Sequence, residues 1–489
     1  MKQERESHVQ PENLKFGGGA AGSVMHPAVM VALLIAIVLI LLLPKRNAIV
    51  PLLVIAFLVP LGQQFTVGGL HVLALRIVIF FAVLRGLFSA RSPEGNRFAG
   101  GFGAFDKIFL TWTFYHVIAF LMLFAFLPAA WINQFGFLWD ILGGYVAIRL
   151  LIQDESDIAR AIRTLAYLSA ILATCMLIER FSYLNIFGFL GGDTRIVPEF
   201  RDGLVRAQAT FAHPLLAGTF GATMMPLFIL YWHNGKSKIE ALMGAISATI
   251  MVVCASSSTP LLAYAAGIGA LCLWPLRKHM RMIRWGLLIL VVTLQLVMKA
   301  PVWFLISHIS LFGSSSSDHR AYLVDVFVRH FNDWWLVGTN AAGTWGWDMW
   351  DTSNQYVAEG ESGGLVAFVC FIAMISYAFG RLGRARKAVE GDLAKEKYYW
   401  ILGAALFSHV IGFFGISYFD QSRMTWFALL VMILAATAPV LATNEKKELQ
   451  PAVAALDVPR ELSEFPWLSA PARKATLGQP GREFKPRRS

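Results

Sequence analysis

Charged residues are scarce in this chain of 489 residues: Asp, Glu, Lys and Arg make up 15% of it, whereas hydrophobic residues make up 56%. Soluble domains usually contain about 25% charged residues. Apolar runs recur along the sequence, as in the unbroken stretch 28–43, and a helix that crosses a bilayer needs roughly 20 such residues. The composition therefore excludes a chain of ordinary soluble domains and predicts a polytopic membrane protein.

Signatures of cofactors and metals are also missing. No P-loop and no glycine-rich dinucleotide motif stands at a strand-to-helix turn, which argues against nucleotide-driven work. The four cysteines lie inside apolar stretches and form no CxxC pair, so neither disulfides nor a zinc site are predicted. The aspartates between 318 and 351 follow no metal-ligand spacing. We expect no metal and no cofactor.

Positive charge is in excess, with a net charge of +11. In a soluble protein this would indicate nucleic acid, but in a membrane protein it reflects Lys and Arg in cytoplasmic connectors. Basic connectors alternate along the chain with connectors that carry no Lys or Arg, at 62–68, 129–134 and 256–259. We therefore expect no nucleic-acid partner and assign the basic connectors to the cytoplasm.

The expected fold is an all-α bundle of about 12–13 transmembrane spans within residues 27–442. A polar segment, 1–26, precedes it and lacks the apolar core of a signal peptide, and a disordered cytoplasmic tail, 443–489, follows. Thirteen spans would leave the N-terminus outside. The candidate spans are 27–43, 48–61, 69–88, 107–128, 135–152, 160–180, 213–233, 239–256, 259–276, 283–300, 363–381, 398–416 and 424–442.

Two connectors differ from the others because they are long and rich in polar residues. They run from 181 to 212 and from 301 to 362, and the charge alternation places both on the outer, periplasmic side. Long loops that must be ordered are where binding and catalytic residues tend to lie. We therefore expect the functional residues in these two loops.

The first loop ends in a segment suited to binding an anion. Arg201 and Arg206 come just before a span that His213 and Pro214 open. The unpaired N–H groups of a helix N-terminus favour an anion, and an arginine beside them adds a bidentate donor for phosphate oxygens. The alternative is that Arg206 only extends to lipid headgroups.

The second loop contains an expected interfacial helix. Ser317 can cap it, His319 and Arg320 fall in its first turn, and apolar residues recur at helical spacing. Asp325 and Arg329 stand four residues apart and most simply form a surface pair. His319 could titrate near neutral pH, although a lone loop histidine is more often inert.

Polar residues then gather just before the next span. Asn354, Tyr356, Glu359 and Glu361 stand there, after a tryptophan-rich stretch that can stack on sugars or form an interfacial belt. A carboxylate in this place could accept a proton from a hydroxyl. Inside a span, His116 is most simply a hydrogen-bonding group between helices.

Three segments together resemble a known family. They are RAQATFAHPLLAG at 206–218, DHR at 318–320 followed by WWLVGTN at 334–340, and SNQYVAEGESGGL at 353–365. In order and spacing they resemble the O-antigen ligase and polymerase family of bacterial surface-polysaccharide synthesis. Where many members have His-Asn-x-Tyr, this chain has Ser353 in place of the histidine, which leans towards a polymerase-like or exopolysaccharide-joining role.

The resemblance implies a nucleotide-independent glycosyltransferase of the bacterial inner membrane. Its donor would be an undecaprenyl-pyrophosphate-linked glycan and its acceptor a glycan or lipid-glycan, with membrane lipids and other polysaccharide assembly proteins as further partners. The expected substrate-binding residues are Arg206, His213, Arg320, Asn354 and Tyr356. His319, Glu359 and Glu361 are the expected candidates for the catalytic base.

Two other functions compete with this one. A lipid-linked glycan transporter or flippase would make no bond, and a non-catalytic partner would only support a polysaccharide assembly complex. A transporter should place ionisable groups near the bilayer centre. This sequence concentrates them in the two outer loops, which favours the enzyme.

Overall fold

The computed structural model describes residues 25–67, 70–89, 97–201, 203–308, 315–419 and 421–456. The regular elements of the described chain are helices, apart from two small antiparallel hairpins. The chain divides into two compact units, Met1–Ala442 and Thr443–Ser489. The first unit holds the helix bundle, and most of the second lies outside the described residues, as does the start of the expected polar segment 1–26.

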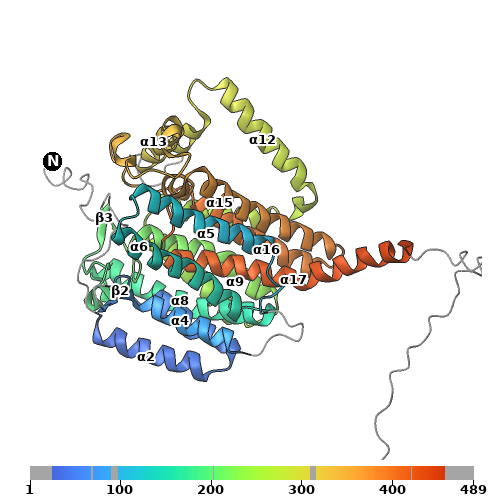
Figure 1. The fold of residues 1–489 in the computed structure, drawn as a ribbon, viewed down its shortest axis with the longest axis horizontal. Coiled ribbons are helices and arrows are strands. Elements are labelled where there is room, and N and C mark those ends of the chain that lie inside the picture. The colour runs from blue at the N-terminus through green and yellow to red at the C-terminus, as the bar shows by residue number, and fades with distance from the viewer. Residues whose placement is uncertain are drawn as a thin grey trace, which may run out of the picture. The chain divides into compact units, whose positions relative to one another are not determined.

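The helices and strands follow in this order (Figure 1): α2 Pro27–Leu42, α3 Ile49–Leu58, β1 Gln64–Val67, β2 Leu70–Leu73, α4 Ala74–Leu87, α5 Ala104–Leu123, α6 Pro128–Leu138, α7 Gly144–Leu151, α8 Glu155–Ser182, β3 Glu199–Arg201, β4 Leu204–Arg206, α9 Pro214–His233, α10 Lys238–Cys254, α11 Ser258–Cys272, α12 Met280–Val297, α13 Ser315–Arg329, α14 Phe331–Trp334, α15 Gln355–Ala388, α16 Leu393–Gly412 and α17 Gln421–Leu456.

Each predicted span overlaps one of these helices, which confirms the helical class. Six helical segments in the described chain are long and apolar enough to cross a membrane, and they include α5, α8, α9 and α15. Two more, α2 and α11, are apolar but shorter. The structure thus supports a multi-pass membrane protein. The number of spans that length and composition support is lower than the predicted 12–13, because helices such as α3 are short.

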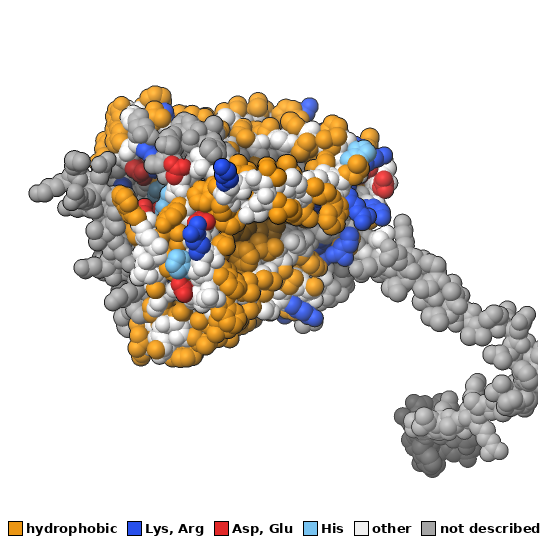
Figure 2. Space-filling view, turned by 90° about the horizontal axis from the view of Figure 1, so that it is seen from above, with side chains coloured by type: hydrophobic (Ala, Val, Ile, Leu, Met, Phe, Trp, Pro, Cys, Tyr) orange, Lys and Arg blue, Asp and Glu red, His pale blue; other side chains and the backbone are white. Residues whose placement is uncertain are grey.

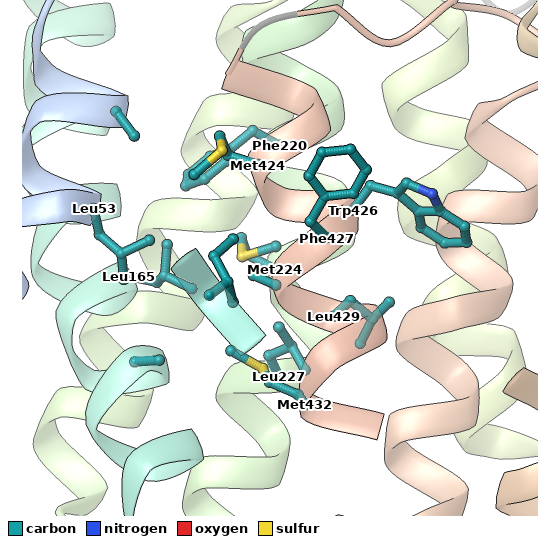
Figure 3. Packing of buried hydrophobic residues seen from close by; sticks show 14 of the residues in the cluster. Leu53, Leu165, Phe220, Met224, Leu227, Met424, Trp426, Phe427, Leu429 and Met432 are labelled. Carbon is teal, nitrogen blue, oxygen red and sulfur yellow. The ribbon is translucent and has the colours of Figure 1, made fainter. Parts of the chain in front are cut away.

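The bundle packs around α9 and α17, whose most apolar windows are each 83% buried. Figure 3 shows Leu53 of α3, Leu165 of α8, Met224 of α9 and Phe427 of α17 meeting in this core. Burying a large apolar side chain contributes about 1.5–3 kcal/mol in water, whereas in a bilayer close packing supplies the attraction. This core fixes the positions of the helix ends that carry the polar loops.

The outer surface of the bundle is largely apolar. Hydrophobic side chains cover much of the face shown in Figure 2. The apolar segment Trp274–Val297, which contains α12, has no buried residues in its most apolar window, and α12 stands apart from the other helices in Figure 1. Such surfaces are expected where lipid, and not protein, surrounds a helix.

The N-terminal end of α2 lies beside the first long loop. Gln63 links the two, because its side-chain oxygen accepts from the backbone N–H of His26 at 2.9 Å and its amide donates to the carbonyl of Leu190 at 2.7 Å. Helix α2 therefore begins on the side of the bundle that carries residues 181–212. This is the side expected for the N-terminus of a bundle with thirteen spans.

Helix α15 begins earlier than the sequence pattern indicated. We predicted loop up to residue 362 and a span from 363, but the helix starts at Gln355 after the cap Asn354. At Gly364 the backbone turns to φ 64° and ψ −167°, a conformation open to glycine. The helix is thus divided into a short polar segment before Gly364 and a long apolar one after it.

Candidate functional site

A β-hairpin in the first loop holds Arg206. The register of β3 and β4 places Arg206 opposite Glu199, and their side chains form an ion pair. The Arg206 side chain is 3% exposed, and its Nε and Nη2 atoms have no hydrogen-bond partner among the described residues. Desolvation lowers the pKa of Arg206. A buried guanidinium with open donors is costly, and an anion in contact with it would relieve that cost.

The segment after Arg206 is held by buried hydrogen bonds. The Glu179 carboxylate at the end of α8 accepts from the backbone N–H groups of Gln208, at 3.1 Å, and Ala209, at 2.9 Å. The Asn185 amide donates to the carbonyl of Ala209 at 2.7 Å. Ala209 has φ 49°, which alanine adopts at a cost. These bonds fix the path of the chain from Arg206 to α9.

His213 caps helix α9 next to this arginine. Its Nδ1 accepts from the backbone N–H of Leu215 at 3.1 Å, and its Nε2 lies 3.7 Å from a Glu199 carboxylate oxygen. Desolvation, and then the positive charge of Arg206, lower the pKa of His213 to about 4, although 38% of its side chain stays exposed. The imidazole is therefore neutral at pH 7, as the cap requires.

The cap gives a first testable prediction. His213→Ala should lower the free energy of unfolding by about 1 kcal/mol because α9 loses an N-cap. His213→Asn, which retains a capping acceptor, should lose less. Thermal unfolding of the purified protein in detergent measures both. Equal melting temperatures for the wild-type protein and His213→Ala would show that the hydrogen bond to Leu215 does not stabilise the helix.

The second loop places Arg320 near the same site. Arg320 lies on α13, is 7% exposed, and its Nε atom has no hydrogen-bond partner among the described residues. Its pKa is lowered to about 10 by desolvation first and then by the positive charge of Arg201, with a further contribution from Arg206, while Asp351 acts in the opposite direction. The charges of the first loop therefore act on Arg320 of the second, and Figure 1 shows β3 and α13 at the same end of the bundle.

The second loop contains a helix, α13, where the sequence predicted one, and its place at a membrane interface stays a prediction. The side chain of its expected cap, Ser317, lies outside the described part of the chain. His319 Nε2 lies 3.2 Å from the backbone oxygen of Asp351. The expected pair of Asp325 and Arg329 is present at 2.8 Å, but its aspartate is buried. The buried face of α13 packs in a small apolar cluster that is separate from the core of the bundle.

A cavity of about 740 Å³ opens between α5, α6, α15 and the region from the end of α16 into α17. Glu359 lines it and is held by three donors: the indole of Trp112 at 2.6 Å, His116 Nε2 at 2.9 Å and the amide of Gln355 at 2.7 Å. This confirms the predicted hydrogen-bonding role of His116 between helices. Arg423 of α17 also lines the cavity.

Glu361 lines the same cavity, and its carboxylate accepts fewer hydrogen bonds than that of Glu359. One carboxylate oxygen accepts from the Thr352 hydroxyl at 2.6 Å, and the other, Oε1, has no hydrogen-bond partner among the described residues. The backbone oxygen of Glu361 accepts from the N–H of Thr339 at 2.7 Å. Thr352 also lines the cavity and follows Asp351, whose charge acts on Arg320. Residues 351 and 352 therefore lie between the cavity and the arginine cluster, which consists of Arg201, Arg206 and Arg320.

The side chains of Asn354 and Tyr356 form hydrogen bonds with the backbone of the fold. The Asn354 side chain accepts from the backbone N–H groups of Tyr356 and Val357, at 2.9 and 3.3 Å. The Tyr356 hydroxyl donates to the carbonyl of Val410 at 2.9 Å. Neither residue is among those that line the cavity. They set where α15 begins, which in turn places Glu359 and Glu361.

Sequence reasoning missed several residues of this region. Glu199 has a local signal, because the Asp-Gly pair at 202–203 is typical of a two-residue hairpin that would place Glu199 opposite Arg206. Trp112 and Arg423 have no local signal, since they reach the cavity from helices far apart in the sequence. Across the described residues, no group of three or more His, Cys, Asp or Glu is arranged to hold a metal ion.

Comparison with family models and with curated proteins finds no relative. No family model matches this chain, and no curated protein matches it. The function is therefore inferred from the residues and their geometry.

Proposed function

We propose that this chain is an integral-membrane glycosyltransferase that joins an undecaprenyl-pyrophosphate-linked saccharide to an acceptor glycan at the periplasmic face of the bacterial inner membrane. The observation that carries the proposal is the convergence of Arg206 and Arg320. Both guanidinium groups are buried, Arg206 with two nitrogen atoms and Arg320 with one that have no hydrogen-bond partner among the described residues, and the charge of Arg206 lowers the pKa of Arg320. Like charges gathered away from water are unfavourable unless an anion joins them.

A diphosphate fits this arrangement. Each guanidinium can donate two parallel hydrogen bonds to phosphate oxygens, and the N-terminus of α9 beside Arg206 favours negative charge. Undecaprenyl pyrophosphate is already a fair leaving group. The enzyme would mainly hold donor and acceptor together and stabilise the negative charge of the departing diphosphate. No nucleotide is needed for such a reaction.

A lipid-linked glycan transporter or flippase remains the second candidate. It is favoured by one observation, the buried pair of His116 and Glu359 between α5 and α15. Ionisable residues at membrane depth are typical of transport pathways. The enzyme is preferred because the arginine cluster lies in the loops, where a reacting headgroup would be bound.

Reconstitution separates the two candidates. Purified protein in liposomes, supplied with a labelled lipid-linked saccharide and no nucleotide, should release undecaprenyl pyrophosphate and lengthen the glycan. Movement of the donor between leaflets without a new glycosidic bond would instead establish the transporter. In a deletion strain, collapse of the glycan ladder to single repeats would indicate a polymerase, which the departure at Ser353 favours. Accumulated long lipid-linked chains would indicate a ligase.

A further inference from the structure

We propose that the cavity between α5, α6, α15 and α17 binds the acceptor saccharide and that Glu361 accepts the proton of the attacking hydroxyl. The proposal rests on the proposed function and adds to it the place of the acceptor and the identity of the base. It is carried by the chemistry of the cavity wall, the open carboxylate oxygen of Glu361 and the link from Glu361 to the arginine cluster.

The cavity wall suits a carbohydrate. Its volume of about 740 Å³ lies within the range of small-molecule sites. Aromatic rings such as those of Trp112 and Trp426 line it beside the amides of Asn133 and Gln134 and the guanidinium of Arg423. Sugar rings present apolar faces for stacking and hydroxyls for hydrogen bonds. A hydrocarbon chain in this place would offer no donor to the open oxygen of Glu361, at a cost of about 1–3 kcal/mol.

The two carboxylates of the cavity differ in their surroundings. Glu359 accepts from Trp112, His116 and Gln355, so three of its roughly four acceptor positions are filled. Glu361 is 8% exposed and has one oxygen without a partner among the described residues. That oxygen is buried in this structure, and a rotation of the side chain towards the cavity would bring it to a hydroxyl of a bound sugar, which would supply the missing donor. Glu361 is thus free to take a proton, whereas Glu359 is fixed in the wall.

The position of Glu361 also fits the reaction. Its other oxygen is held by Thr352 at 2.6 Å, and the backbone oxygen of the preceding residue, Asp351, lies 3.2 Å from Nε2 of His319, the neighbour of Arg320 on α13. The base therefore lies on the part of the cavity wall that is connected to the arginine cluster. A donor with its diphosphate on Arg206 and Arg320 would present its anomeric carbon towards this part of the cavity.

The step balances without any other reagent. The acceptor hydroxyl oxygen attacks the anomeric carbon, and a new carbon–oxygen bond forms as the bond from that carbon to the phosphate oxygen breaks. The hydroxyl proton passes to Glu361. The electron pair of the broken bond leaves with undecaprenyl pyrophosphate, whose added negative charge the two arginines stabilise. Water that enters later can remove the proton from Glu361.

Glu361→Gln tests the base. In lipid nanodiscs, with a lipid-linked donor and an acceptor glycan, we expect kcat for joining to fall about 100-fold or more, with donor binding unchanged. Azide carries no proton that must be removed. It should therefore restore release of undecaprenyl pyrophosphate from Glu361→Gln, with a glycosyl azide as the product. A structural role of Glu361 would show no such rescue.

Gly363→Ala tests the cavity separately. A Cβ at Gly363 would lie 2.5 Å from the Cβ of Ala367 and 2.8 Å from ring atoms of His116, so both α15 and the His116 ring that lines the cavity must shift. We expect the KM for the acceptor to rise severalfold while donor binding stays unchanged. Gly380→Ala on the same helix is the control, because a Cβ there meets no described atom within 4 Å.

The outcomes are distinct. Wild-type kcat in a folded Glu361→Gln protein would overturn the assignment of the base. An unchanged acceptor KM in Gly363→Ala would overturn the cavity as the acceptor site. If the wild-type protein itself joins no glycan, the proposed function fails, and this inference fails with it.

Discussion

Replacing Arg320 or Arg206 with alanine is expected to lower the rate of glycan joining by about 100- to 1,000-fold, the usual effect of removing one group that stabilises negative charge in a transition state. Both side chains are buried and carry nitrogen atoms without partners among the described residues. Glycan ladders in a complemented deletion strain, read beside the protein level in the membrane, measure the effect. Normal polymer length and yield from both variants would contradict the proposed anion site.

Lysine is not expected to replace either arginine. Its ammonium is a point charge and cannot donate two parallel hydrogen bonds to a diphosphate. Arg206→Lys and Arg320→Lys should therefore lose most of the activity while retaining the positive charge. Joining at the wild-type rate by both variants would show that charge alone, without bidentate geometry, is sufficient.

Two control variants separate an anion site from a structural ion pair. If Arg206 served only to pair with Glu199, then Glu199→Gln would be as harmful as Arg206→Ala. We expect Glu199→Gln to retain joining, because the diphosphate still has its arginine. Arg329 lies on the same helix as Arg320, but its side chain is 71% exposed. Arg329→Ala should change the rate little.

The second large effect is expected on stability. Glu179→Ala leaves the buried backbone N–H groups of Gln208 and Ala209 without their acceptor. Each unsatisfied buried donor costs about 1–3 kcal/mol, so the free energy of unfolding should fall by roughly 2–6 kcal/mol. Glu179→Gln has the same shape but one accepting oxygen, and it should lose about half as much. Thermal unfolding in detergent, with the yield of folded protein, measures both.

A control on the same helix is Ser182→Ala. Its hydroxyl is exposed and bonds only to nearby backbone atoms, so the change should stay within about 0.5 kcal/mol. Equal stability of Glu179→Ala and Ser182→Ala would mean that the segment from Arg206 to α9 does not depend on the carboxylate. Such a result would weaken the account of how Arg206 is held in place.

The sequence was informative where patterns are local. The periodic apolar residues predicted α13, and the apolar runs predicted each long helix. The start of α15 was missed because residues 355–364 are polar and rich in glycine. The signal for that start is Asn354, whose side chain caps the helix, but an asparagine in a long loop is also an ordinary turn residue.

The site was predictable only in part for a similar reason. Arg206 and Arg320 stood out because each lies in one of the two long polar loops, but the effect of one charge on the other depends on how these loops fold together. The contacts between His116, Trp112 and Glu359 join residues more than 240 positions apart. No local pattern encodes such a contact, since it depends on α5 packing beside α15 (Figure 1).

Backbone hydrogen bonds on both sides of the turn at Gly364 connect the second loop with the cavity wall. The N–H of Leu365 donates to the carbonyl of Trp335 at 2.8 Å, and the carbonyl of Glu361 accepts from Thr339 at 2.7 Å. These two hydrogen bonds therefore hold residues 335–339 against residues 361–365. Because two hydrogen bonds join these segments, a displacement of residues 335–339 would displace Glu361 too unless both bonds break, so the position of this carboxylate depends on the second loop as well as on α15.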